Sequence, residues 1–154
     1  MLHWIEAALD GYAHVGVSGR EGQNRVMNPT AESTRYMRVL AYRTAEYAQV
    51  DPGRMVDDYE DMDTNLQLLR LGHPSLVTYI WAQGQAKTNS AGGCSLYRTN
   101  ETHDAAARRL AELHPGLVRL RQKDNKTDRG GFGTRTEVTI AWKAALREGL
   151  VTKS

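Results

Sequence analysis

The amino-acid sequence predicts an α+β fold, in which a helical N-terminal part is followed by a domain that contains a C-terminal β-hairpin. Apolar residues recur at helical spacing in several segments of the first half of the chain. Residues 117–121 and 137–142 instead alternate apolar and polar side chains, and a polar, glycine-rich connection separates them. Alternation on both sides of such a connection is typical of two antiparallel strands.

Composition places the chain among soluble globular proteins. Its 154 residues suffice for one domain with a core, and 40% are hydrophobic and 25% charged. Cys94 is the single cysteine, which excludes an internal disulfide and a cysteine-based zinc site. The first ten residues resemble an amphipathic helix and not a signal peptide, and no segment approaches the ~20 apolar residues of a membrane span. We therefore expect a cytoplasmic protein that needs no cofactor and does not associate with membranes.

Charge is distributed unevenly along the chain. Residues 1–96 carry 8 Lys and Arg against 11 Asp and Glu, whereas residues 97–154 carry 12 against 7. The net charge of +2 thus conceals an acidic first part and a basic second part. A basic segment of this kind favours an acidic partner, most commonly nucleic acid. Two solvated surfaces of unlike composition are the alternative.

The N-terminal part is expected to be mainly helical. Residues 2–10 form an amphipathic pattern that ends at Gly11, and residues 12–17 form a short strand. Helices are predicted over 29–49, from about 55 to 71, and over 75–83, because capping residues and prolines precede them. We assign residues 1–72 to a helical part for dimerisation or partner binding, and residues 73–154 to a nucleic-acid-binding domain.

The C-terminal domain contains the best-defined elements. Residues 101–113 predict a helix whose inner face carries alanines and leucines, and His114-Pro-Gly116 ends it. The two alternating strands follow, and residues 143–150 predict a last helix. The helix contains Ala106-Ala-Arg-Arg-Leu-Ala-Glu-Leu113, the first strand begins Gly116-Leu-Val-Arg119, and Trp142 follows the second strand.

Residues 74–143 resemble a winged helix-turn-helix domain of the type found in bacterial and bacteriophage DNA-binding regulators. The resemblance implies that the helix over 101–113 is a recognition helix, that the hairpin is a wing, and that a positioning helix falls within 88–100. It further implies a role in transcription regulation, and a bacteriophage or mobile element as the source.

Two groups of residues are candidates for nucleic-acid binding. Arginine can present a fork of hydrogen-bond donors to guanine or phosphate, and asparagine and threonine can bond base edges or phosphates. The helix supplies Asn100, Thr102, Arg108 and Arg109. A cationic loop with small residues can follow a phosphate backbone. The hairpin supplies Lys123, Lys126, Arg129 and Arg135.

The acidic run from Asp57 to Asp63 has five carboxylates in seven residues. On a helix, Asp57, Asp58 and Asp61 lie together, and we interpret them as a surface for a basic protein partner. The glycine and terminal glutamate of a calcium loop are missing, so no metal site is predicted.

Taken together, these features favour a non-catalytic, double-stranded DNA-binding protein in a regulatory or accessory role, with a protein partner or a second copy bound by the N-terminal helices. Two alternatives remain open. One is a protein-interaction module, such as an inhibitor of a host enzyme or a virion component. The other is a small metal-independent ribonuclease that uses His114 and Glu137 with Arg119 and Arg121 as phosphate-binding residues. That alternative requires Glu137 and Arg119 to share one face of the hairpin.

Overall fold

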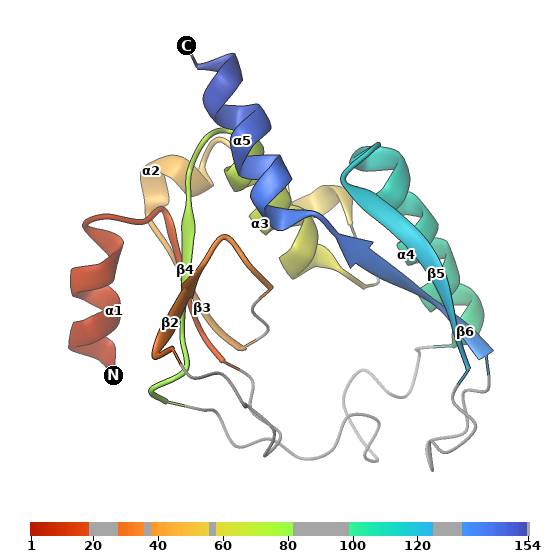
Figure 1. Cartoon of the computed structure of the whole chain (residues 1–154), viewed down its shortest axis with the longest axis horizontal. Helices are drawn as coiled ribbons and strands as arrows, with labels where there is room; N and C mark the ends of the chain where they lie inside the picture. The colour runs from red at the N-terminus through yellow and green to blue at the C-terminus, as the bar shows by residue number, and fades with distance from the viewer. Residues whose placement is uncertain (19–27, 36–37, 56–57, 82–98, 125–133, 154) are drawn as a thin grey trace. The chain divides into compact units, whose positions relative to one another are not determined.

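The structure of the chain, a computed structural model, describes residues 1–18, 28–35, 38–55, 58–81, 99–124 and 134–153 (Figure 1). These residues form five α-helices, one 3-10 helix, a four-stranded sheet and a two-stranded sheet. The α+β class is therefore confirmed. Two compact units divide the chain: a sheet unit of residues 1–51, 64–85 and 142–154, and a hairpin unit of residues 52–63 and 86–141. The boundary predicted between residues 72 and 73 divides the chain differently.

Four short strands form the sheet of the sheet unit, in the order β2-β4-β1-β3. They are β1 (His14–Val17), β2 (Thr30–Glu32), β3 (Arg38–Tyr42) and β4 (Ser75–Thr78). The two central strands, β1 and β4, run parallel, and each edge strand is antiparallel to its neighbour. Every residue of both central strands is buried, so side chains on both faces of the sheet are covered.

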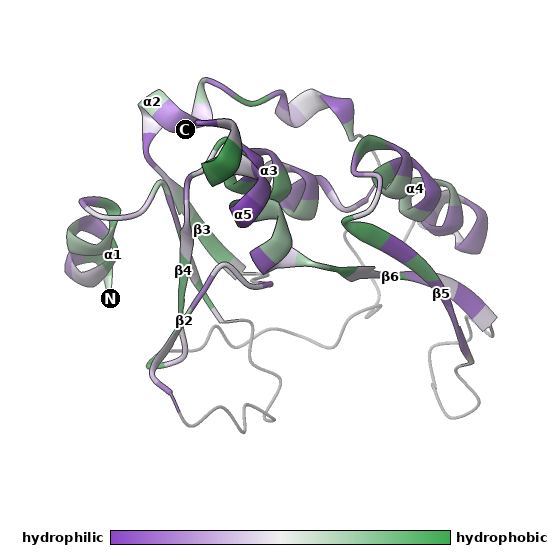
Figure 2. Cartoon of the chain, turned by 45° about the horizontal axis from the view of Figure 1, so that its top comes forward, coloured by the Kyte–Doolittle hydropathy of each residue, from purple (hydrophilic) through white to green (hydrophobic). Residues whose placement is uncertain are grey.

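Helix α1 (Leu2–Leu9) lies against one face of this sheet (Figure 1). Its Ile5 packs with Val15, Val17 and Leu76 in an apolar cluster, which Trp4 and Trp81 extend with an edge-to-face ring contact. Helices α3 (Glu60–Arg70) and α5 (Trp142–Thr152) lie on the side away from α1 (Figures 1 and 2). The α3 residues Leu66, Leu68 and Leu69 are completely buried. Burial by helices from both sides explains why neither central strand shows an alternating pattern.

Helix α5 approaches the end of α3 at Gly149. A Cβ atom at Gly149 would lie 2.4 Å from the carbonyl oxygen of Leu69 and 2.5 Å from the amide nitrogen of Gly72. Both neighbours are backbone atoms, which no rotamer change can remove.

We therefore expect Gly149→Ala to destabilise the protein by about 3 kcal/mol, because overpacking outweighs the better helix propensity of alanine. Urea unfolding of the variant measures this loss. Gly11→Ala is the matched control, since its Cβ would lie 4.0 Å from the nearest neighbouring atom. Equal unfolding midpoints for the two variants would contradict this packing.

The hairpin unit consists of a helix packed on a two-stranded sheet (Figure 1). Helix α4 (Asn100–Leu113) lies along the hairpin of β5 (Val118–Asp124) and β6 (Thr134–Ile140). The strands pair antiparallel in one continuous register, from Val118 opposite Ile140 to Asp124 opposite Thr134. The segment from 52 to 63 completes the unit, with the 3-10 helix η1 (Pro52–Arg54) and the first turn of α3.

Most elements predicted from local patterns are confirmed. The N-terminal helix, the short strand after it, the helix over 101–113, both strands of the hairpin and the last helix all form. The predicted helix ends after α3 and α4 are also correct. Gly72 and Gly116 adopt positive φ angles there, of 76° and 80°, which favour glycine. The helix predicted from about 55 to 71 is shorter and begins at Glu60.

Two predicted helices are wrong. Residues 29–49 contain strands β2 and β3 and the short helix α2 (Thr44–Tyr47), and residues 75–78 form the central strand β4. Asn28-Pro29 and Pro74 were interpreted as helix starts, but each precedes a strand. The N-terminal part therefore contains a sheet in addition to its helices. The positioning helix expected within 88–100 falls almost wholly outside the described residues. None of the helices in the described part of the chain has the length and hydropathy needed to cross a membrane.

Candidate nucleic-acid interface

The two faces of the hairpin differ in polarity because side chains alternate along each strand. One face packs on α4: Val118 and Thr136 are buried, and the Asp104 carboxylate of α4 accepts a 2.8 Å hydrogen bond from the Thr136 backbone amide. The opposite face, here called the outer face, is formed by Arg119, Arg121, Lys123, Arg135, Glu137 and Thr139. Four cations and one carboxylate give it a net charge of +3.

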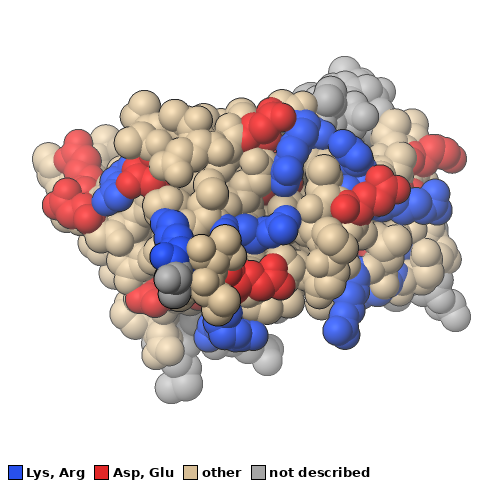
Figure 3. All heavy atoms as spheres, turned by 90° about the horizontal axis from the view of Figure 1, so that it is seen from above, with Lys and Arg blue, Asp and Glu red and all other residues tan. Residues whose placement is uncertain are grey.

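Hydrophilic residues increase along β5 towards the end that leads into residues 125–133. Figure 2 shows hydrophobic positions at the beginning of β5 and hydrophilic ones towards its end. The outer face is a local concentration of positive charge, with four cations and one carboxylate. Figure 3 shows basic and acidic side chains interspersed on the face of the molecule that it displays.

Glu137 binds three of the four cations of the outer face. Arg121 Nη2 donates to Glu137 Oε2 at 2.7 Å, and Arg135 donates to Oε1 through Nη2 at 2.7 Å and Nε at 3.1 Å. Lys123 Nζ donates to the same Oε1 at 3.3 Å. Burial disfavours the ionised carboxylate, but hydrogen bonds from Arg135, Arg121 and Lys123 and the charge of Lys123 outweigh it and lower the pKa of Glu137 to about 2. The positive potential at this point is therefore strong.

The register places two like charges directly opposite each other. Lys123 faces Arg135, whereas Arg121 faces Glu137. Like charges at opposed positions of an antiparallel pair are destabilising. Glu137 relieves part of this repulsion because its carboxylate bonds both cations. The two cations are therefore held at opposed positions by one carboxylate that bonds both.

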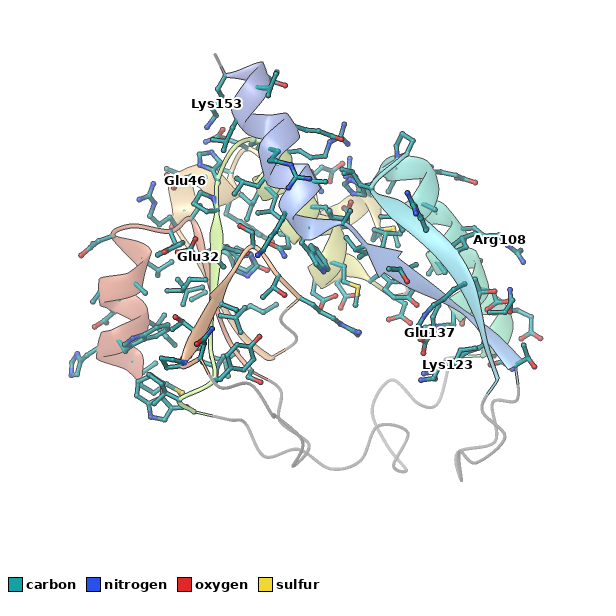
Figure 4. The ribbon with its side chains drawn as sticks, in the orientation of Figure 1. Glu32, Glu46, Arg108, Lys123, Glu137 and Lys153 are labelled. Atoms are coloured by element: carbon teal, nitrogen blue, oxygen red, sulfur yellow. The ribbon has the colours of Figure 1, made fainter. Side chains whose placement is uncertain are left out.

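Helix α4 holds the other predicted residues on the opposite side of the hairpin unit. Arg108 and Arg109 are exposed, and Arg109 lies 3.7 Å from Glu112 on the same helix. Figure 4 shows Arg108 directed away from the hairpin, whereas Lys123 and Glu137 lie on the hairpin side. Because α4 covers the inner face of the hairpin, one flat ligand surface cannot contact Arg108 and the outer face together.

The helix start is occupied by a capping interaction. Thr99 and Thr102 form a reciprocal capping box: the Thr99 hydroxyl accepts from the Thr102 amide at 3.2 Å, and the Thr102 hydroxyl accepts from the Thr99 amide at 3.0 Å. Thr102 thus has a structural role. Asn100 is the first residue of α4 and is partly buried. Lys126 and Arg129, which were also predicted to bind nucleic acid, lie outside the described residues.

The acidic run is largely engaged within the hairpin unit. Asp58 Oδ2 lies 2.6 Å from His103 Nδ1, and the other ring nitrogen of His103 lies 2.9 Å from the hydroxyl of Tyr59. Asp61 accepts a hydrogen bond from the Met62 amide at the start of α3. Asp57 lies outside the described residues. The partner surface predicted from Asp57, Asp58 and Asp61 therefore includes one carboxylate that already binds a histidine.

A second carboxylate of the run, Asp63, forms the buried charge cluster of the hairpin unit. Arg54 donates to Asp63 through Nε at 2.8 Å and Nη2 at 2.6 Å, and His114 Nε2 lies 2.7 Å from Asp63 Oδ1. A carboxylate only accepts, so Nε2 of His114 carries the hydrogen. Burial disfavours ionisation of Asp63, but hydrogen bonds from His114 and Arg54 outweigh it and lower the pKa of Asp63. We predicted neither Arg54 nor Asp63 as a member of a site.

The arrangement that the ribonuclease alternative requires is present for Arg119, Arg121 and Glu137 but not for His114. Alternation along the strands places Arg119, Arg121 and Glu137 on the outer face together. His114 is completely buried and bonded to Asp63, so it is not available to a substrate on that face. Within the described ranges, no group of three or more His, Cys, Asp or Glu side chains could hold a metal ion.

Arg119 and Arg121 were considered for the ribonuclease alternative alone, yet they belong to the outer face. The apolar and basic alternation of residues 117–121 was the signal that could have identified them as surface cations. Comparisons with protein-family models, curated proteins and solved structures gave no match to this chain.

Proposed function

We propose that the chain is a non-catalytic, double-stranded DNA-binding protein of a regulatory or accessory type, and that the outer face of the hairpin contacts the DNA. The observation that carries the proposal is the concentration of Arg119, Arg121, Lys123 and Arg135 on one face of a two-stranded ribbon whose other face is covered by α4. The major groove admits a two-stranded β-ribbon as well as a helix.

The spacing of the cations supports contact with a phosphate backbone. Arg119, Arg121 and Lys123 are alternate residues of β5, so their Cα atoms are about 6.6 Å apart along the strand. This repeat is comparable with the distance between adjacent phosphates of one nucleic-acid strand. Among the described residues, Arg119 makes no side-chain hydrogen bond or ion pair, so its five donors are available to a ligand.

This proposal keeps the double-stranded DNA expected from the resemblance but moves the contact from the helix to the ribbon. In a winged helix, the recognition helix would present Arg108 to the bases. Here Arg108 and the outer face point in opposite directions (Figure 4). The net charge of the outer face, +3, favours the ribbon, because the exposed arginines of α4 are offset by Glu101, Asp104 and Glu112.

Arg119→Ala should weaken binding to a fluorescently labelled, random-sequence DNA duplex about five- to tenfold at low salt, and should reduce the salt slope by about 0.9. Fluorescence anisotropy across a salt series measures both quantities, and the wild-type slope should be roughly −3. Arg108→Ala is the matched control, because it removes an exposed arginine from the same unit on the opposite side.

We expect Arg108→Ala to bind as the wild type does. If Arg108→Ala weakened binding and Arg119→Ala did not, the recognition helix would be the DNA-binding element. If the wild type bound no duplex, or bound it equally at low and moderate salt, the proposed function would be wrong.

A further inference from the structure

The position of the Glu137 carboxylate has the chemistry of a phosphate site. Two guanidinium groups and one ammonium group converge on its two oxygens from both strands of the hairpin. Charge-assisted bonds from arginine forks are the usual means of binding a phosphate. The low pKa of Glu137, about 2, shows that this point strongly favours a negative charge.

The three cations retain donors beyond those that Glu137 uses. A guanidinium has five N–H donors and an ammonium three. Arg121 contributes one bond to Glu137, Lys123 one and Arg135 two. The site is also accessible to solvent, since the side chain of Glu137 is 17% exposed and that of Arg121 is 58% exposed. An oxyanion from solvent can therefore reach the same three groups.

We infer that Arg121, Lys123 and Arg135 form a phosphate-binding site that the carboxylate of Glu137 occupies in the free protein. A backbone phosphate takes the place of the carboxylate when nucleic acid binds. The inference deepens the proposed function, because it identifies one phosphate contact of the outer face and the residue that opposes it. No covalent step is involved, since one anion replaces another.

The exchange explains the like charges that face each other across the hairpin. Without an anion, Lys123 and Arg135 would repel at directly opposed positions. Glu137 relieves part of this repulsion in the free protein and keeps long side chains ordered, so the bound phosphate does not have to order them. The same carboxylate lowers the affinity for nucleic acid, because it reduces the net charge of the outer face to +3.

The test compares Glu137→Gln with Glu112→Gln. Both variants lose one negative charge, but Glu112 is exposed on α4, away from the outer face. Glu137→Gln should bind a random-sequence DNA duplex about tenfold more tightly at 50 mM salt, with a salt slope steeper by about 0.9. It should also bind inorganic phosphate, seen as chemical-shift changes of the Arg121 and Arg135 guanidinium groups in NMR spectra. Glu112→Gln should show neither change.

Inorganic phosphate separates this inference from the proposed function. If the wild type binds no DNA but Glu137→Gln binds phosphate at these arginines, the proposed function fails and the phosphate site stands. If the wild type binds DNA and Glu137→Gln binds neither more tightly nor to phosphate, the inference fails and the proposed function stands. Weaker DNA binding by a folded Glu137→Gln would likewise overturn the inference.

Loss of Glu137 leaves Lys123 and Arg135 to repel each other, which could prevent the Glu137→Gln variant from folding. Circular dichroism shows whether it folds. If it does not, the double variant Lys123→Thr with Glu137→Gln removes the repulsion and keeps both arginines. The phosphate titration is then carried out on this variant. Shifts of its guanidinium signals support the site, and a folded double variant without them overturns it.

Discussion

Asp63→Ala should lower the free energy of unfolding by about 3–5 kcal/mol, because it removes the carboxylate that binds a largely buried guanidinium and a buried imidazole. The side chain of Asp63 is 1% exposed, and that of His114 is fully buried. Arg54 binds the carboxylate with two nitrogens, and it is three-quarters buried. Urea unfolding at neutral pH measures the loss.

The control for this prediction removes a carboxylate of ordinary exposure. Glu112→Ala should change the free energy of unfolding by less than about 1 kcal/mol, since Glu112 is exposed and, within the described residues, pairs with Arg109 on the helix surface. A second comparison replaces Arg54, Asp63 and His114 together by Met, Leu and Phe. This variant should recover most of the stability, because no charge is left buried. An Asp63→Ala protein as stable as Glu112→Ala would contradict the charge cluster.

The acidic run was interpreted as a partner surface, and the engagement of Asp58 and Asp63 within the hairpin unit could not be predicted from it. Counting charges along seven residues shows a run of carboxylates, but it does not show where their partners lie. His103 is 45 residues from Asp58, and His114 is 51 residues from Asp63. The pairing depends on the packing of segment 52–63 against α4, which is a tertiary contact. Local patterns carry no information about it.

Helix α4 and the hairpin could be predicted because each is buried on one face only. One-sided burial produces an alternating pattern in β5 and β6 and a helical pattern in α4. Strand β4 is buried on both faces, so Leu76 and Val77 are adjacent apolar residues that fit a helix equally well. A central strand of four residues offers too few positions to distinguish the strand period of about 2 residues from the helix period of about 3.6 residues.

The predicted DNA-binding residues lie on two opposite sides of the hairpin unit, and the sequence predicts this separation in part. The sequence predicts alanines and leucines on the inner face of the helix over 101–113, and alternating apolar and polar side chains over residues 117–121. A helix that buries one side against the buried face of a hairpin must direct its other side away from the outer face. The packing of α4 on the hairpin is a tertiary contact, which local patterns do not reveal.

Acidification should destabilise the sheet unit through His14. This side chain is completely buried in the central strand β1, with its ring 4.1 Å from that of Tyr42. Burial lowers the pKa of His14 from 6.5 to about 3. Between these values the unfolded chain binds a proton that the folded chain does not. Stability is therefore complete above pH 6.5 and is lost as the pH falls towards 3.

The free energy of unfolding should fall by up to about 1.4 kcal/mol per pH unit in this window, or about 2–3 kcal/mol between pH 6.5 and 4.5. Urea midpoints measured over this range show the slope. His14→Phe keeps an aromatic ring beside Tyr42 and removes the titrating group, so its slope should be shallower by this amount. His73, whose pKa is also lowered by burial and by the charge of Lys153, titrates in both proteins and cancels from the difference.

His3→Gln completes the comparison. This variant replaces a fully exposed histidine of α1 and leaves the buried His14 in place. Equal slopes for the wild type and His14→Phe would mean that His14 exchanges protons freely in the folded state. The imidazole would then have to reach solvent, and strand β1 could not be covered on both faces. The pH series therefore tests, through one side chain, whether helices cover both sides of the central strands.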